Sequence, residues 1–276
     1  MAHFGGDYLE QTLEAMDKIS QGDFSVLIEV DEHDPFSEIT KSVNRIATEL
    51  GSMENLRQDF VSNVSHEIQS PLTSIKGFAA LLKSDNLTAE QRAHYIDVIE
   101  SEAKRLSQLS DNLLKLSTLE SNVAPLSPSK FPLDRQIRNS VLMLEPQWAE
   151  KHLNMTLSMD KIVISADEAL LNQVWINLLQ NAIKFTPESG EISVSLTEQD
   201  GFAQVKITDT GIGISEESLP HIFERFYKAD KSHTRAAGGN GLGLSIVKKI
   251  ITLHDGKITV KSELGAGTEF VITLPK

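Results

Sequence analysis

The stretch FVSNVSHEIQSPLTSIKGFAALL occupies residues 60–82 and has the pattern of an amphipathic helix. Its apolar residues recur at spacings of three and four, and they are Val61, Val64, Ile68, Leu72, Ile75, Ala79 and Leu82. At about 100° per residue, His66 lies opposite this stripe, so we expect its imidazole to face solvent beside Glu67. Pro71 removes a backbone N–H from the helix, and such breaks are expected at functional sites. On its own, the stretch is better explained as a surface His-Glu pair beside a tolerated proline.

The composition limits what the chain can be. It has 276 residues, of which 40% are hydrophobic and 24% charged, which is ordinary for a soluble protein of two or three domains. The net charge of −13 argues against nucleic acid or an anionic membrane surface as a main partner. The absence of cysteine excludes disulfides and thiol nucleophiles. No apolar run approaches the ~20 residues of a membrane span, so we expect a cytoplasmic chain or the soluble part of a longer protein.

Two helical patterns are joined by an extended connector near the start of the chain. The first precedes the stretch at residues 60–82, and the second includes it. The first covers residues 9–19 and ends at Gly22, and apolar and polar residues alternate over residues 24–28. The second begins near Ser37 and continues into residues 60–82. Because two short helices bury little surface alone, we expect this part of the chain to pair with a second copy of itself.

Another helix follows a turn at residues 84–88. Thr88 and Gln91 have the spacing of a capping box, which places the start of the helix after Thr88. Its apolar residues lie close to a heptad seam, and they are Ile99, Ala103, Leu106, Leu109, Leu113 and Leu116. One helical hairpin has a single apolar seam, so we predict that two hairpins pair into the four-helix bundle of a homodimer.

Three prolines between residues 122 and 132 indicate a linker, and the pattern changes beyond it. Strands are predicted near residues 192–196, 205–207, 258–260 and 270–274, and helices near residues 133–151, 167–185 and 242–254. We therefore predict a multidomain α and α+β chain. In it, a helical coiled-coil or four-helix-bundle dimer is followed by an α/β sandwich with a mainly antiparallel sheet.

One polar cluster in this C-terminal part is suited to a nucleotide. Asn177, Asn181 and Lys184 share a face of the helix that Asp167 opens. Amide oxygens suit Mg²⁺, and an ammonium suits phosphate oxygens. Taken alone, these three residues are better explained as a polar helix face in water.

Two glycine-rich loops add to this cluster. Asp209 follows a predicted strand and precedes Gly211 and Gly213, so its carboxylate can accept from an exocyclic amine while the glycines admit a planar ring. Residues 238–243 (GGNGLG) lead directly into a helix, where free N–H groups favour phosphate. Each loop is also compatible with an ordinary turn. The P-loop, GxGxxG, HRD, DFG, HExxH and GxSxG signatures are absent from the sequence.

In combination, these motifs resemble those of a sensor histidine kinase from a bacterial two-component system. The similar segments follow that family's order: the phosphoacceptor box at 65–71, the N box at 177–187, the first glycine box at 209–214, the F box at 223–228, the second glycine box at 238–248 and the closing motif at 262–270. The resemblance implies a dimerisation and phosphotransfer hairpin at residues 53–121, a linker at 122–132 and a GHKL-type ATP-binding domain at 133–276.

Residues 1–52 resemble a HAMP signal-relay module. Pro35 and Ser37, however, stand where that module usually has Glu and Gly. The resemblance implies transmembrane and sensing segments before Met1, so that the chain is the cytoplasmic portion of a membrane protein.

The resemblance also implies an activity and its residues. A protein-histidine kinase phosphorylates its own histidine with ATP and passes the phosphoryl group to an aspartate of a response regulator receiver domain. His66 is then the phosphoacceptor, Glu67 accepts its Nδ1 proton, Asn181 holds Mg²⁺, and a lid spans about residues 226–241. The implied nucleotide-binding residues are Asn177, Asn181, Lys184, Asp209, Gly211, Gly213, Lys228, Gly239, Gly241, Leu242, Gly243 and Thr268.

A departure from the family pattern concerns the dephosphorylation of the response regulator. Gln69-Ser70 replaces the common Arg-Thr pair, and in this family the second of these residues often orients a water that dephosphorylates the regulator. Ser70 keeps a hydroxyl but loses a methyl group, so we expect a phosphatase activity that is retained but modest.

Two alternatives remain open at this point. A gyrase-like or MutL-like ATPase explains the motifs after Asp167 but not the stretch around His66. The second alternative is a non-catalytic dimeric scaffold that binds nucleotide as a switch.

Overall fold

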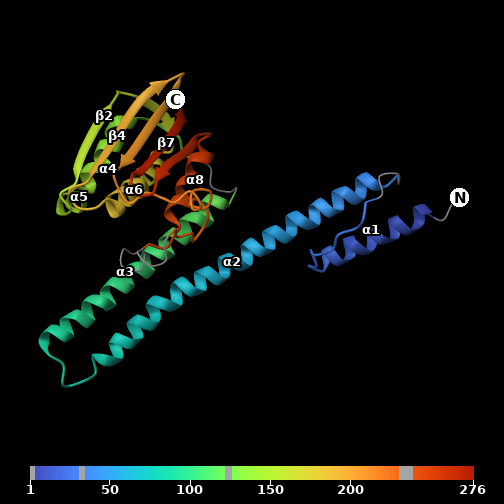
Figure 1. Ribbon diagram of the computed structural model, residues 1–276, viewed down its shortest axis with the longest axis horizontal. Coiled ribbons are helices and arrows are strands. Elements are labelled where there is room, and N and C mark those ends of the chain that lie inside the picture. Colours follow the sequence, from blue (N-terminus) through green and yellow to red (C-terminus); the bar gives the residue numbers. More distant parts are fainter. Residues whose placement is uncertain (1–3, 31–34, 122–125, 230–238) are drawn as a thin grey trace. The chain divides into compact units, whose positions relative to one another are not determined.

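The computed structural model describes residues 4–30, 35–121, 126–229 and 239–276 (Figure 1). They belong to two compact units, Met1–Gln69 and Ser70–Lys276, and each unit is described on its own. Among the described residues, none of the helices combines the length and apolar character that a membrane span requires.

The first unit contains helix α1 (Phe4–Ser20) and the beginning of helix α2 (Ser37–Leu81). A small core of Ala15, Ile28 and Val43 joins the two helices and their connector. The side chain of Asn44 holds the connector in place, because it donates to the carbonyl oxygen of Ile28 at 2.8 Å and accepts the N–H of the same residue at 3.0 Å. A single amide therefore takes the place of a strand partner for this residue.

Helix α2 is one continuous element, as the periodicity predicts. It runs through Pro71 without interruption and continues into the second unit. Several of its large apolar side chains are exposed in the single chain, including Met53 at 65%, Leu56 at 66% and Leu72 at 49%.

The predicted helical hairpin is confirmed by helix α3 (Ala89–Glu120), which follows α2 after a short turn (Figure 1). The predicted capping box is present, because Thr88 Oγ1 accepts the N–H of Gln91 at 3.1 Å and Gln91 Oε1 accepts the N–H of Thr88 at 3.1 Å. Near the turn, the ring of Phe78 on α2 packs against that of Tyr95 on α3, with centroids 5.3 Å apart.

An α/β sandwich forms the rest of the second unit. Its five-stranded sheet has the order β2-β4-β5-β7-β6. The bounds are β2 (Asn154–Met159), β4 (Glu191–Gln199), β5 (Phe202–Asp209), β6 (Lys257–Glu263) and β7 (Gly267–Pro275). All pairs are antiparallel except β2 with β4, which is parallel. The predicted mainly antiparallel sheet is therefore confirmed, and β2 is an additional edge strand that the sequence pattern does not predict.

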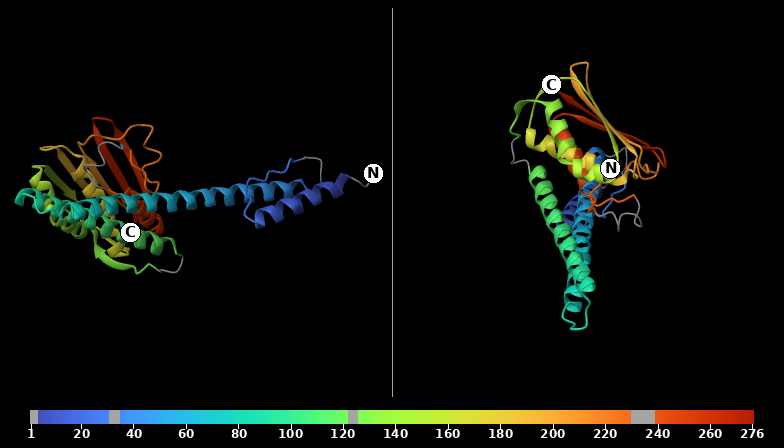
Figure 2. Two further views of the ribbon diagram at one scale, coloured as in Figure 1. Left: turned by 90° about the horizontal axis from the view of Figure 1, so that it is seen from below. Right: turned by 90° about the vertical axis from the view of Figure 1, so that its left-hand side faces the viewer.

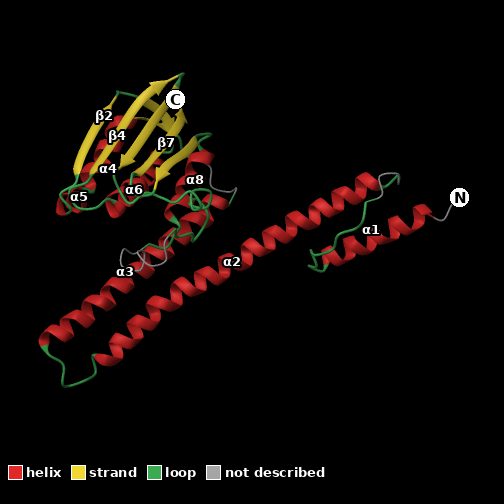
Figure 3. Ribbon diagram, in the orientation of Figure 1, coloured by secondary structure: helices red, strands yellow, loops and turns green. Residues whose placement is uncertain are grey.

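Helices α4 (Leu133–Met143), α6 (Glu168–Phe185) and α8 (Gly243–Leu253) cover one face of the sheet (Figures 2 and 3). The predicted helix at 133–151 is in fact α4 followed by α5 (Glu145–Glu150), because Pro146 at the start of α5 cannot continue the helix of α4. A short ribbon pairs β1 (Ser129–Pro132) with β3 (Val163–Ala166). Trp175 of α6 is fully buried, and its Nε1–H donates to Gln136 Oε1 on α4 at 2.8 Å.

Candidate functional site

The start of α6 is tied to the end of α8. Asp167 caps α6, since its Oδ1 accepts the N–H of Leu170 at 3.1 Å. The N–H of Asp167 donates to Nε2 of His254 at 3.0 Å, while Nδ1 of His254 lies 2.8 Å from the carbonyl oxygen of Ile250. Because Nε2 accepts, the proton of this neutral imidazole belongs on Nδ1. The two helices that carry the N box and the second glycine loop are thereby held side by side.

The second glycine loop lies against the polar face of α6. A Cβ atom added at Gly243 would be 3.7 Å from Oδ1 of Asn177, and one added at Gly239 would be 2.9 Å from Nζ of Lys184. Nδ2 of Asn177 is buried without a hydrogen-bond partner among the described residues. Since a buried polar group without a partner is costly, this amide indicates a place for a ligand.

A second ammonium group, that of Lys228, acts electrostatically on Lys184. Burial lowers the pKa of Lys184, and the positive charge of Lys228 lowers it further. Two positive charges that repel each other favour a ligand that carries several negative charges. The structure thus brings together Asn177, Lys184, Lys228, Gly239 and Gly243, which we call the phosphate-side cluster.

A second cluster forms at the end of β5. Asp209 is buried and accepts the N–H of Gly211 at 2.8 Å, and it is paired with Thr268 across the β5–β7 ladder. Burial raises the pKa of Asp209, and the N–H groups of Gly211 and Thr268 act in the opposite direction. A buried carboxyl group of this kind is a common feature of ligand sites.

Two glycines that follow Asp209 leave no room for a side chain. A Cβ atom at Gly211 would lie 2.6 Å from Oδ1 of Asp209 and 2.7 Å from the carbonyl oxygen of Phe185. Gly213 has φ +69°, and its Cβ would lie 2.0 Å from the carbonyl oxygen of Glu263. Asp209, Gly211, Gly213 and Thr268 therefore form a tightly packed group, which we call the base-side cluster.

Ser262 supports the base-side cluster, although it is not among the predicted site residues. Its Oγ donates to the carbonyl oxygen of Gly267 at 2.7 Å, accepts the N–H of Ile214 at 2.8 Å and lies 2.9 Å from Oγ1 of Thr268. A serine inside an alternating strand carries no spacing signal. Only its place in the closing motif could have indicated it.

Gly241 and Leu242 have structural roles next to these clusters. The carbonyl oxygen of Gly241, which has φ +69°, accepts the N–H of Phe226 at 2.9 Å. The side chain of Leu242 is fully buried, so only its main chain can meet a ligand. Most of the predicted lid, residues 230–238, lies outside the described residues.

The last turn of α6 joins the two clusters. Lys184 belongs to the phosphate side, while the carbonyl oxygen of the next residue, Phe185, accepts the N–H of Ile212 in the first glycine loop at 3.2 Å. Asn181 is half-buried on the same helix. The described residues contain no group of three or more His, Cys, Asp or Glu side chains arranged to hold a metal ion. A cation here would therefore rely on amide, water and phosphate oxygens.

The candidate phosphoacceptor residues lie on α2. His66 is exposed, as its position opposite the apolar stripe predicts, and Glu67 is half-buried beside it. Ser70 is exposed one turn further on.

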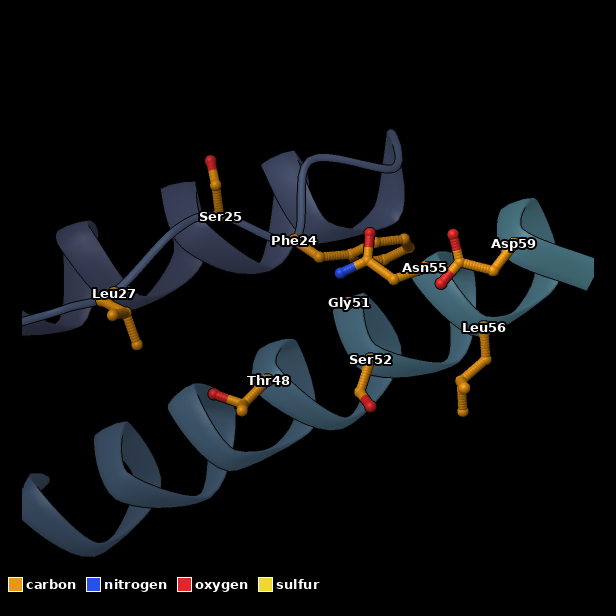
Figure 4. Close-up of a pocket in the computed structure, with 9 residues that line it drawn as sticks. All are labelled: Phe24, Ser25, Leu27, Thr48, Gly51, Ser52, Asn55, Leu56 and Asp59. Atoms are coloured by element: carbon orange, nitrogen blue, oxygen red, sulfur yellow. The ribbon is translucent and has the colours of Figure 1, made fainter. Parts of the chain in front are cut away.

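The first unit also contains an open hollow of about 470 Å³ (Figure 4). It lies between the connector and α2, with Phe24 and Leu27 on one side and Asn55 and Asp59 on the other. None of the predicted site residues lines it.

Three parts of the chain match known families. Residues 1–52 match the HAMP domain, residues 56–122 match the His Kinase A (phospho-acceptor) domain, and residues 166–276 match the histidine kinase-, DNA gyrase B-, and HSP90-like ATPases. The phosphoacceptor match distinguishes the chain from proteins that have only the ATPase domain in common with it.

Similar proteins align with nearly the whole chain. The sensor histidine kinase YclK of Bacillus subtilis is 33% identical over 97% of the chain and 58% of its own length. The heme sensor protein HssS of Staphylococcus saprophyticus is 35% identical over 97% of the chain and 57% of its own length. The chain therefore spans somewhat more than half the length of these relatives.

A solved complex of the histidine kinase ThkA with the response regulator protein TrrA is similar in structure, with a TM-score of 0.68 and 29% identity over 82% of this chain and 63% of that one. The fold and the clustered motifs define a GHKL-type ATPase domain that follows a phosphoacceptor hairpin. The chain belongs to the sensor histidine kinases and combines HAMP, phosphoacceptor and ATPase domains.

Proposed function

We propose that this chain phosphorylates His66 with the γ-phosphoryl group of ATP and then passes that group to an aspartate of a response regulator. The observation that supports the proposal is the presence in one chain of an exposed histidine within the phosphoacceptor match and of a two-part nucleotide cluster within the ATPase match. ThkA, a similar kinase, is known in complex with a response regulator.

In this proposal the two clusters bind opposite ends of ATP. The carboxylate of Asp209 accepts from the exocyclic amine of adenine, with Gly211 and Gly213 leaving room for the ring. Nδ2 of Asn177, which has no partner among the described residues, and the ammonium groups of Lys184 and Lys228 bind the phosphates. A bound Mg²⁺ would neutralise charge on the phosphates, and we assign Asn181 as the residue that holds it.

The chemistry at His66 requires little from the protein beyond positioning. Glu67 accepts the Nδ1 proton, so the lone pair on Nε2 is available to attack the γ-phosphorus in line. The Nε2–P bond forms as the bond from phosphorus to the β,γ-bridging oxygen breaks, and ADP leaves. Phosphoryl transfer to an aspartate carboxylate then returns the histidine to its starting state.

Labelling with ATP tests this function. With γ-labelled ATP and Mg²⁺, we expect the wild-type chain to acquire an acid-labile, base-stable label, and the variant His66→Gln to show only background. The matched control is His94→Gln, which alters another exposed histidine, on α3, and should retain the label. Labelling of His66→Gln at the wild-type level, or no label on the wild type, would contradict the proposal.

We also propose that the working form is a homodimer. The exposed apolar side chains of α2, among them Met53 and Leu56, lie on a helix that the described residues of one chain leave partly uncovered. A second copy would cover them in a four-helix bundle.

Residues 1–52 are proposed to relay a signal to a hairpin at 53–121, which a linker at 122–132 connects to the ATP-binding domain at 133–276. The HAMP match and the greater length of the relatives support a role as the cytoplasmic output of a membrane-tethered sensor.

A substitution at Ser70 tests whether the protein also removes the phosphoryl group from the response regulator. We propose that its exposed hydroxyl orients a water for dephosphorylation of the regulator, so Ser70→Ala should lengthen the lifetime of the phosphorylated regulator several-fold. The measurement is the decay of purified phosphorylated regulator with added kinase and ADP. Ser74→Ala, one helical turn away, serves as the control. Identical decay with wild type and Ser70→Ala would exclude the role.

A further inference from the structure

The carboxyl end of α6 lies between the two halves of the candidate nucleotide site. Lys184 in its last turn reaches the phosphate-side cluster, and the carbonyl oxygen of Phe185 holds Ile212 of the first glycine loop. A shift of this turn would therefore move both clusters. The last carbonyl groups of a helix have no partner within the helix, so something else has to hold them.

A single ammonium group satisfies most of these carbonyl oxygens. Nζ of Lys151 donates to the carbonyl oxygen of Ile183 at 2.7 Å, to that of Lys184 at 3.2 Å and to that of Thr186. An ammonium group has three donors and no acceptor, so every donor has a partner here. Its positive charge also complements the negative end of the helix dipole.

The main chain of Lys151 fastens the other side of the same connection. Lys151 ends α5, and its carbonyl oxygen accepts the N–H of Ser189, in the turn between α6 and β4, at 3.0 Å. One residue thus holds both the end of α6 and the turn that follows it.

We propose that Lys151 is a positioning residue for the nucleotide site. Its ammonium group fixes the last turn of α6, and through that turn it sets the position of the Lys184 ammonium and of the first glycine loop. The proposal rests on the proposed binding of ATP.

A purely structural role makes a different prediction. If Lys151 only capped α6, its loss would lower the free energy of unfolding and leave the ATP affinity of the folded protein unchanged. The end of α6 has a second cap that does not involve Lys151, because the N–H of Thr186 donates to the carbonyl oxygen of Ala182 at 3.0 Å and its Oγ1 donates to the same atom at 2.6 Å. We therefore expect the domain to fold without the ammonium group.

The absence of cysteine allows a chemical test of the charge. In Lys151→Cys the new thiol is the only one in the chain, so it can be alkylated selectively. Bromoethylamine restores an ammonium group at nearly the reach of lysine, and iodoacetamide adds a neutral amide of similar size. The two products come from one protein preparation, so their comparison holds even if Lys151→Met does not fold.

Isothermal titration with ATP is the measurement. We expect Lys151→Met and the amide form of Lys151→Cys to bind ATP at least about tenfold more weakly than wild type, and the aminoethyl form to recover most of the affinity. In a Lys184→Met background, Lys151→Met should weaken binding by a smaller factor, because part of its effect passes through Lys184.

Two results separate this inference from the proposed function. If the wild-type chain does not bind ATP, both are refuted. If the wild type binds ATP and the neutral Lys151 variants bind it equally well, only the positioning role is refuted. The positioning role would also be refuted if Lys151→Met weakened ATP binding by the same factor in the wild-type and Lys184→Met backgrounds.

Discussion

Asp209→Asn is expected to weaken ATP binding at least about tenfold while raising the free energy of unfolding at pH 7. Hydrogen bonds to charged groups are worth roughly 1.5–3 kcal/mol, and the amide that replaces the carboxylate presents a donor as well as an acceptor to the adenine amine. The same substitution removes a buried negative charge from the end of β5, which is why stability and affinity should change in opposite directions.

The pH dependence of this effect follows from the sign of the pKa shift. Burial raises the pKa of Asp209 in the folded protein above its value in the unfolded chain, so the folded state holds the proton more strongly. The contribution of Asp209 to stability is therefore fully present below the ordinary aspartate pKa of 3.8 and is lost as the pH rises through the raised value.

Urea denaturation of wild type and Asp209→Asn at several pH values would measure how the free energy of unfolding depends on pH. ATP titration on the same samples would measure the affinity. We expect the stability advantage of the variant to grow as the pH rises above 3.8. Asp160→Asn, at an exposed site of the same domain, is the control. A loss of stability at pH 7, or unchanged ATP affinity, would contradict the proposed role of Asp209.

Gly267→Ala is expected to destabilise the ATPase domain by more than about 3 kcal/mol and to abolish ATP binding at ambient temperature. A Cβ atom at this position would lie 1.9 Å from the carbonyl oxygen of Asp209, at φ +98°, so β5 and β7 would have to separate where the base-side cluster is built. Overlap with backbone cannot be relieved by rotating a side chain.

The chain offers a matched control two residues earlier. Gly265 also has a positive φ, +81°, but nothing lies within 4 Å of its Cβ position. Gly265→Ala should therefore lose only the conformational term of about 1 kcal/mol and retain ATP binding. Chemical denaturation of both variants gives the comparison, and similar losses for the two would show that close packing at Gly267 is not the cause.

Much of the fold was predictable because it depends on local patterns. The helical period around His66, the capping box at Thr88 and the N-cap at Asp167 involve residues a few positions apart, and all three are present in the structure. The edge strand β2 was missed, since its sequence NMTLSM is partly polar and acquires its conformation by pairing with β4.

The glycine positions were also readable from the sequence, although the reason for them was not. Gly213 was expected to admit a planar ring, whereas in the structure its missing side chain also allows contact with the backbone of Glu263. The spacing of a glycine motif shows that room is needed but not which atoms fill it.

The sequence alone determined the family, the exposed histidine and the identity of the two glycine loops, because these features reside in short motifs and in a regular helical period. Only the tertiary structure revealed how the last turn of α6 is held between the clusters. Lys151 lies 32 positions before Ile183, whose carbonyl oxygen its ammonium binds, and Ser262 lies 48 positions after Ile214. Such contacts depend on which main-chain groups the fold leaves without partners, and no periodicity along the chain reports that.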